Sequence, residues 1–319
     1  MRRQTGHDVA EQARILVVSG KRQVADGMVE LVCEPGDGDA LPRWAPGAHV
    51  DLVLGPDLAR PYSLCGDPDD TRRWRFLVRR GSRDSGVSAY LHDQLRAGDT
   101  LRARGPRDRF PLANAARYLF LASGAGIAPL LPMVARVRAA RIYPWSLLLF
   151  EPGTAVGPLH DEMDSLGPAA SIVGHFDSVA AAIAAASPGT AVQAAGSSRF
   201  VTAVEAQAGR RGDLDLHRQR FDNLAADSAG GSACELVLAR QGGRVFVPPG
   251  TPLLRALLDA GVAVPWACGS GICGACVLPV LDGKIRHRDA VLTAAEREAG
   301  RLVVTCVSTA ATETLVLDV

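Results

Sequence analysis

The stretch Cys268-Gly-Ser-Gly-Ile-Cys273-Gly-Ala-Cys276 places three cysteines within nine residues, and Cys306 follows after another 29. A secreted disulfide framework is small and rich in cysteine throughout, whereas these four thiols gather near one end of a 319-residue chain. Their spacing therefore predicts a metal site. The other three of the seven cysteines are isolated and are expected to be small buried hydrophobic side chains: Cys33, Cys65 and Cys234.

The order of the gaps indicates which metal centre the four thiols would hold. Four residues and then two separate the first three cysteines, which is the pattern of a plant-type [2Fe-2S] site. Structural zinc, the alternative, usually takes two short cysteine pairs. Glycines between the ligands allow positive φ angles and a close approach of backbone N–H groups to sulfur: Gly269, Gly271 and Gly274. We therefore favour iron-sulfur ligation by Cys268, Cys273, Cys276 and Cys306.

Composition and charge exclude several classes of protein. The chain is 47% hydrophobic and 22% charged, which is ordinary globular usage, and its length predicts two or three domains. Lys and Arg total 35 against 34 Asp and Glu, so no net positive field would attract nucleic acid or an anionic membrane. No apolar run approaches the roughly 20 residues that span a bilayer, and the N-terminus lacks the apolar region of a secretory signal. We expect a cytoplasmic protein that binds neither nucleic acid nor membrane.

Hydrophobic patterning divides the chain into three expected domains. Residues 1–113 contain short apolar or alternating runs between turns, which predict a β-barrel or sandwich. Residues 114–222 alternate strand-like and helix-like segments, which predict a parallel sheet with helices. The small, polar, Gly-containing segment 223–232 is interpreted as a linker. Residues 233–319 combine a predicted hairpin, a short helix and the cysteine loop.

The string Arg60-Pro61-Tyr62-Ser63-Leu64 resembles the flavin-binding signature of ferredoxin reductases. Together with the C-terminal cysteines, the domain order resembles the phthalate dioxygenase reductase and vanillate demethylase reductase family over nearly the whole chain. This resemblance implies an antiparallel β-barrel that binds FMN, an α/β parallel-sheet domain that binds NADH, and an α+β β-grasp ferredoxin domain. It also implies a partner, a terminal oxygenase or demethylase. A flavin is chemically reasonable here because it can link a two-electron hydride donor to a one-electron cluster.

The resemblance also implies which residues contact the flavin. Arg60, Tyr62 and Ser63 would lie against the ring and ribityl chain, and a later strand would add Val78 and Arg79. Phe221 would pack near the edge of the flavin. The family has a Gly-Gly-Ser phosphate site before a helix, where backbone N–H groups bind an anion. Its counterpart here would be Gly86, Val87 and Ser88, in which Val87 replaces the second glycine. The alternatives are a core tyrosine, a plain N-cap at Ser88 and an ordinary core phenylalanine.

Gly124-Ala125-Gly126-Ile127-Ala128-Pro129 follows a predicted strand and opens a predicted helix. In that context Gly124, Gly126 and Pro129 are expected to shape a pyrophosphate-binding turn. Glu151 should end the next strand, where a carboxylate would accept a hydrogen bond from a ribose 2′-hydroxyl and repel a 2′-phosphate. Gly196 should lie at the end of a later strand of the sheet and form part of the nicotinamide site.

Two departures from the family pattern concern the nicotinamide site. The chain reads Ala195-Gly196-Ser197 where the family has Cys-Gly-Pro, and Phe150-Glu151-Pro152-Gly153 replaces the segment that usually carries an arginine. Two functions therefore stay open. One is an NADH-dependent oxidoreductase that supplies a partner oxygenase, with no residue of this chain assigned as catalytic. The other is an electron-transfer or assembly subunit with a degenerate nicotinamide site. His287-Arg288-Asp289 resembles a family sequence, and no catalytic role is assigned to it.

Overall fold

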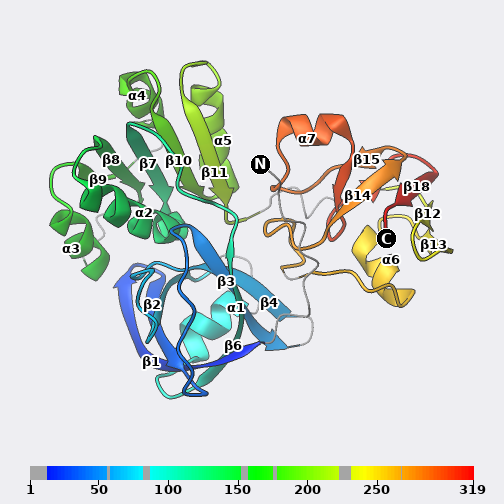
Figure 1. Cartoon of the computed structure of the whole chain (residues 1–319), viewed down its shortest axis with the longest axis horizontal. Coiled ribbons are helices and arrows are strands. Elements are labelled where there is room, and N and C mark those ends of the chain that lie inside the picture. The colour runs from blue at the N-terminus through cyan, green and yellow to red at the C-terminus, as the bar shows by residue number, and fades with distance from the viewer. Residues whose placement is uncertain are drawn as a thin grey trace. The chain divides into compact units, whose positions relative to one another are not determined.

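The computed structural model describes residues 13–55, 58–81, 87–151, 157–174, 178–222, 231–266 and 268–319 (Figure 1). The chain divides into two compact units. The first comprises Met1–Ala195 and Val204–Arg218, and the second comprises Gly196–Ala203 and Gln219–Val319. Within the described ranges, the helices are all too short or too polar to cross a membrane.

The N-terminal half of the first unit is a six-stranded antiparallel sheet. Its strands are β1 (Arg14–Ala25), β2 (Met28–Pro35), β3 (Ala48–Gly55), β4 (Leu58–Ser63), β5 (Trp74–Arg79) and β6 (Thr100–Asp108), in the order β4-β3-β6-β1-β2-β5. An antiparallel bridge between Leu64 and Phe76 joins the two edge strands, so the sheet closes into a barrel. The barrel, rather than the sandwich, is the architecture that the chain adopts. Helix α1 (Val87–Ala89) and the π-helical turn η1 (Tyr90–Gln94) lie between β5 and β6.

Strand β5 is buried on both faces. Successive residues of a strand point to opposite sides, and one set of alternate residues packs into the barrel core: Trp74, Phe76 and Val78. The other set carries Arg75, Leu77 and Arg79, and its middle member is only 3% exposed. A charged outer face with a buried leucine indicates that another part of the first unit covers it.

The parallel sheet expected after the barrel is confirmed. Its strands are β7 (Tyr118–Ser123), β8 (Trp145–Phe150), β9 (Ala170–Val173), β10 (Ala191–Gly196) and β11 (Asp215–Arg220), in the order β11-β10-β7-β8-β9. The β10–β7, β7–β8 and β8–β9 pairs are parallel. Parallel neighbours need crossover connections, which helices provide. These are α2 (Ile127–Ala140), α3 (Pro158–Ser165), α4 (Ser178–Ala185) and α5 (Ser198–Ala208).

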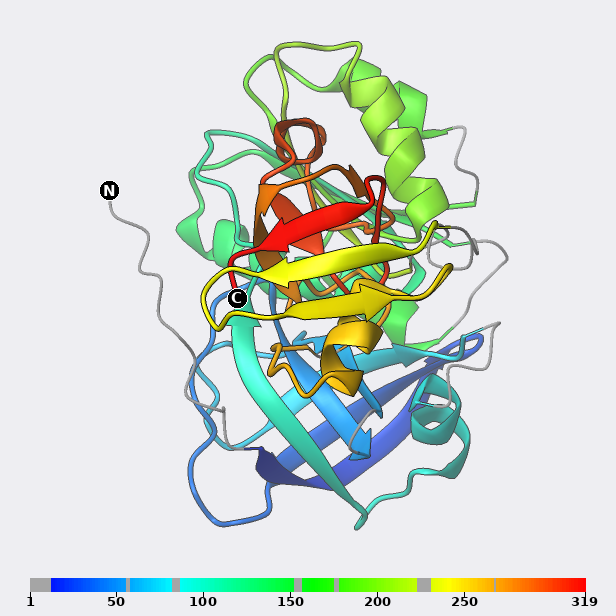
Figure 2. The ribbon, with the colours of Figure 1, turned by 90° about the vertical axis from the view of Figure 1, so that its right-hand side faces the viewer.

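The C-terminal part has an α+β fold. The main sheet contains β12 (Cys234–Leu238), β13 (Arg244–Val247), β14 (Val277–Asp282), β16 (Leu302–Val304) and β18 (Thr314–Leu317), in the order β13-β12-β18-β14-β16. Strand β12 runs parallel to β18, and the other pairs are antiparallel. Helix α6 (Leu253–Asp259) contributes Leu253 and Leu257 to the same core as Leu236 and Leu315. Figure 2 shows β12 and β13 in yellow beside β18 in red, with α6 in gold next to them.

Smaller elements complete this part. They are β15 (Ile285–Arg286), β17 (Thr309–Ala310) and helix α7 (Ala294–Ala299), which begins with a capping box between Thr293 and Glu296. The first eight residues of the expected linker, 223–230, lie outside the described residues. The division into 1–113, 114–222 and 233–319 therefore stays a prediction.

Candidate functional site

Three of the cysteines that the spacing predicted as ligands lie in the loop between α6 and β14, and the fourth, Cys306, follows β16. All four are buried, and the most exposed, Cys306, reaches only 7%. Hydrogen bonds join the Cys268 thiol to Cys273 and Cys306, and another joins Cys276 to Cys306. Four buried sulfurs linked by these three contacts form a soft donor set that suits an iron-sulfur cluster. In the described part of the chain, no three His, Cys, Asp or Glu side chains form the shell of a single metal ion.

Hydrogen bonding between the thiols favours ionisation of two of them. Bonds from Cys273 and Cys306 hold the pKa of Cys268 well below its usual range, although burial opposes this. A bond from Cys306 lowers the pKa of Cys276 to about 7, again against the effect of burial. The same hydrogen bonds, together with burial, raise the pKa of Cys273 and of Cys306. Two of the four cysteines therefore favour the thiolate, the form that binds metal, and the other two must lose a proton on ligation.

The backbone of the loop has the conformation that its glycines were expected to allow. Gly269, Gly271 and Gly274 have φ angles of 62°, 70° and 68°, which few other residues adopt readily. The Ser270 N–H donates to the Cys268 sulfur over 3.4 Å. The Ala290 N–H donates to the Gly271 carbonyl over 2.8 Å. The segment after His287-Arg288-Asp289 thus supports the loop through its backbone.

The residues of the predicted flavin signature lie on β4, next to β3. Cross-strand neighbours are Leu52 with Arg60, Val50 with Tyr62 and His49 with Ser63. Tyr62 packs partly against the barrel core, and burial raises the pKa of its hydroxyl. The Arg60 guanidinium donates to the Ala59 carbonyl over 2.8 Å. Arg60 and Tyr62 therefore share one face of β4, as alternate strand residues must.

The other residues predicted to contact the flavin differ in where their side chains lie. Val78 and Val87 both point into the barrel core, so each can offer a ligand only its backbone. This explains why valine is tolerated at position 87: the side chain fills the core. The Ser88 hydroxyl accepts a hydrogen bond from the Gly81 N–H over 3.3 Å. Gly86 lies outside the described residues.

The predicted dinucleotide turn opens α2 after β7. Gly124–Gly126 form a short 3-10 turn, and Gly126 and Pro129 are buried. Gly124 has a φ of 55°, and a Cβ atom there would lie 3.0 Å from Nη1 of Arg79. The positive φ favours glycine at this turn, and the guanidinium of Arg79 from the barrel lies close beside it.

Gly196 and Phe221 are brought together at the end of β10. The Phe221 N–H donates to the Gly196 carbonyl over 2.9 Å, and the phenylalanine is half-buried rather than part of a closed core. Asp222 accepts from the Ser198 N–H at the start of α5 over 2.5 Å. Ala195 is fully buried and pairs with Ala122 of β7, so the position where the family carries a thiol lies near the carboxyl end of an inner strand of the sheet.

Glu151 follows β8 directly, as expected, and its surroundings are unexpected. Its Oε1 atom forms an ion pair with Nη1 of Arg79, a residue predicted to contact the flavin. The side chain is only 5% exposed, and Oε2 has no hydrogen-bond partner among the described residues. Oε2 thus keeps its full capacity to accept a hydrogen bond, whereas Oε1 already contacts Arg79.

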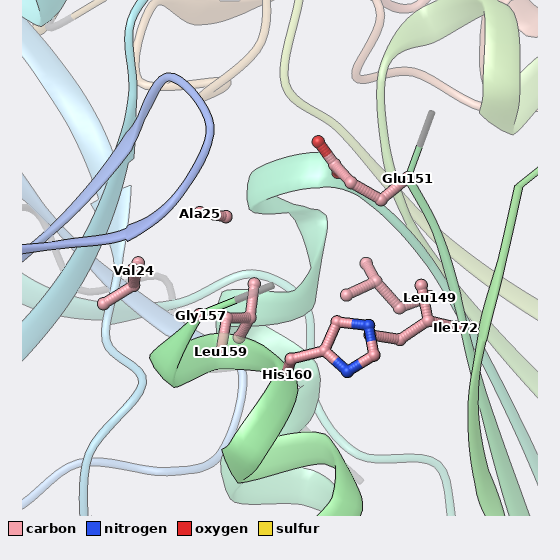
Figure 3. A pocket seen from close by; sticks show the side chains of 8 residues that line it. All are labelled: Val24, Ala25, Leu149, Glu151, Gly157, Leu159, His160 and Ile172. Atoms are coloured by element: carbon pink, nitrogen blue, oxygen red, sulfur yellow. The ribbon is translucent and has the colours of Figure 1, made fainter. Parts of the chain in front are cut away.

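A small, mostly apolar pocket adjoins Glu151 (Figure 3). It lies between the end of β1 and the carboxyl ends of β8 and β9, where open α/β sheets bind ligands. Its lining residues are Val24, Ala25, Leu149, Glu151, Gly157, Leu159, His160 and Ile172.

The sequence analysis missed a second arginine on β5. Arg75 forms ion pairs with Glu162 of α3 and with Glu30 of β2, and Arg22 also contacts Glu30. Burial opposes ionisation of Glu30, but Arg22 and Arg75 together hold its pKa below the ordinary value. The sequence does contain a signal for this contact, because Arg75 and Arg79 interrupt an otherwise apolar strand.

The sequence of this chain is similar to a known domain family and to known proteins. Residues 237–311 match the 2Fe-2S iron-sulfur cluster binding domain family. The chain is 35% identical to the phenoxybenzoate dioxygenase subunit beta of Ectopseudomonas oleovorans over 88% of this chain and 89% of that protein. It is 32% identical to the vanillate O-demethylase oxidoreductase of a Pseudomonas strain, over 95% of this chain and 99% of the relative.

Two solved structures are also similar to this chain. Phthalate dioxygenase reductase matches with a TM-score of 0.72 and 26% identity, over 96% of this chain and 98% of the other. Full-length CYP116B46 from Tepidiphilus thermophilus matches with a TM-score of 0.79 and 34% identity, over 96% of this chain. The match covers only 42% of that longer chain.

Proposed function

This chain belongs to the family of phthalate dioxygenase reductase and vanillate O-demethylase oxidoreductase, and we propose that it passes electrons from NADH through FMN and a [2Fe-2S] cluster to a separate terminal oxygenase or demethylase. The observation that carries this proposal is the set of four buried thiols, three in one loop and the fourth just after β16, on a chain that also contains a barrel and a parallel sheet. A bound flavin accepts a hydride as an electron pair and releases single electrons, which a one-electron cluster requires.

In this proposal each part of the chain holds one group. The cluster is ligated by Cys268, Cys273, Cys276 and Cys306. The N–H of Ser270 donates a hydrogen bond to one ligand sulfur, that of Cys268. The Arg60 guanidinium lies beside the flavin ring, and the start of α1 offers N–H groups to the flavin phosphate. The turn Gly124–Gly126 binds the pyrophosphate of NADH, and Phe221 packs at the flavin edge.

The partner is proposed from the relatives. The dioxygenase subunit and the demethylase oxidoreductase named above both belong to oxygenase systems. Their overall likeness to this chain supports a protein partner that receives single electrons. The near-zero net charge favours local recognition of that partner over binding to nucleic acid or membrane, and we propose a cytoplasmic location.

Ala195 favours one alternative function. Because the thiol expected in the family is missing there, the chain could act as an electron-transfer or assembly subunit with a degenerate nicotinamide site. Anaerobic titration with NADH distinguishes the two. Reduction of the flavin and then the cluster, followed by absorbance and electron paramagnetic resonance, is the expected result. Reduction by dithionite but not by NADH would favour the alternative.

The cofactors are tested on the same protein. Extraction and mass measurement should give FMN together with about two irons and two sulfides per chain. Release of FAD would contradict the FMN assignment. Arg60→Ala should weaken flavin retention, because it removes a charge-assisted contact of roughly 1.5 to 3 kcal/mol.

A further inference from the structure

The outer face of β5 is joined to the parallel-sheet part of the first unit at two points. Arg75 and Arg79 are four residues apart and therefore point to the same side of the strand. Arg75 pairs with Glu162 on α3, and Arg79 pairs with Glu151 after β8. Leu77, between the two arginines, is buried. The strand predicted to line the flavin is thus also the strand that contacts the nucleotide-binding sheet.

Arg75 is held in a single orientation. Its Nη1 and Nη2 atoms donate to the two oxygens of Glu162 over 2.8 and 2.6 Å, which is the two-pronged geometry of arginine with a carboxylate. Its Nε atom donates to Glu30 on the neighbouring strand. Glu30 also accepts from Arg22 over 2.5 Å. We call Arg75, Glu30, Glu162 and Arg22 the Arg75 network.

This network is better suited to fixing a position than to adding stability. A buried ion pair repays little more than the cost of removing its charges from water, but it has a defined direction and partner. An apolar contact of the same size could slide along β5. The Arg75 side chain is 20% exposed and Glu162 is 29% exposed, so the pair is largely removed from solvent.

The second contact explains why the position matters. Arg79 lies against Gly124, which opens the proposed dinucleotide turn. A shift of α3 and the sheet along β5 would therefore change the distance between this turn and the flavin strand. Hydride transfer is steeply sensitive to such a change, because a displacement of about 1 Å can cost roughly 100-fold in rate.

We propose that Arg75 is a positioning residue that holds the nucleotide-binding sheet against β5 through Glu162 and Glu30, in the register required for hydride transfer. This inference rests on the proposed function, since it concerns the transfer from NADH to the flavin. Loosening the network should reduce the limiting rate of flavin reduction while binding of NADH changes little.

Stopped-flow reduction of the flavin by NADH tests this in the full-length protein with its cofactors. Glu162→Gln keeps the shape of the side chain and removes its charge. We expect the limiting rate to fall about tenfold or more and the apparent Kd for NADH to change less than about twofold. Asp318→Asn is the matched control, because Asp318 forms the same two-pronged pair with Arg240, over 2.6 and 2.6 Å, on the C-terminal sheet. It should leave the limiting rate unchanged.

A double-mutant cycle adds a readout that loss of folding would not produce. The effects of Arg75→Gln and Glu162→Gln on the limiting rate should be strongly non-additive, because both remove the Arg75–Glu162 pair, and only Arg75→Gln also removes the contact with Glu30. Flavin content and thermal unfolding are measured for every variant. If Glu162→Gln does not fold, Glu162→Asp takes its place, and a smaller fall in the same rate is expected.

The outcomes separate this inference from the function on which it rests. A native protein that NADH cannot reduce would overturn both. Normal reduction of the native protein with an unchanged rate in the Glu162 variant would overturn the positioning role alone. Additive effects in the cycle, or equal losses in rate and affinity, would do the same.

Discussion

The cluster loop and the dinucleotide turn are built in opposite ways. Three of the four cluster thiols lie within nine residues, and the shape of their loop follows from its own glycines. The turn at Gly124–Gly126 instead lies against Arg79, a side chain from the barrel. A site whose ligands are close in sequence leaves a spacing that can be read directly. At a site formed where two sheets meet, the sequence shows the glycines of the turn but not the side chain from the barrel that lies beside them.

The largest effect is expected at the cluster loop. Cys273→Ser should abolish the cluster while the flavin remains, because a [2Fe-2S] cluster of this type requires four thiolates. The visible spectrum and the iron content measure the loss. Cys234→Ser is the matched control, since that thiol is also buried but is absent from the loop. An unchanged visible spectrum in the Cys273 variant would contradict the assignment of Cys273 as a cluster ligand.

A smaller effect is expected at Glu151, where the two sheets of the first unit meet. A carboxylate near the ribose should favour NADH over NADPH, and Glu151→Gln should reduce that preference by up to about tenfold. Two unit charges at about 4 Å and an effective dielectric near 20 interact by roughly 4 kcal/mol before screening, and the nearby Arg79 offsets part of this. The ratio of limiting flavin reduction rates with the two donors measures the preference. Equal rates of flavin reduction by NADH and NADPH in the native protein would show that Glu151 does not set a preference between the two donors.

The smallest effect concerns Ala195. If the thiol that the family carries at this position helps to orient nicotinamide, Ala195→Cys should raise the limiting rate several-fold with little change in affinity. Ala194→Cys is the control, because successive strand residues point to opposite faces. Stopped-flow reduction gives both constants. A lower or unchanged rate in the Ala195 variant would show that the missing thiol is not limiting.

The sequence predicted the barrel, the parallel sheet and the clustered thiols, because each follows from periodicity or short spacing. It did not predict the pairing of Arg75 with Glu162, which lie 87 residues apart. Likeness to a family was also a poor guide to side-chain direction. Val78 and Val87 both point into the barrel core, so a position can match a binding motif while its side chain serves packing.

The charged face of β5 also affects how the first unit responds to heat. The free-energy cost of removing charged groups from water falls as temperature rises, whereas hydrophobic stabilisation per unit area levels off. A junction that holds Arg75 between Glu30 and Glu162 therefore loses less of its strength on warming than an apolar junction would. On heating, we expect the barrel core to melt before its sheet separates from the parallel sheet.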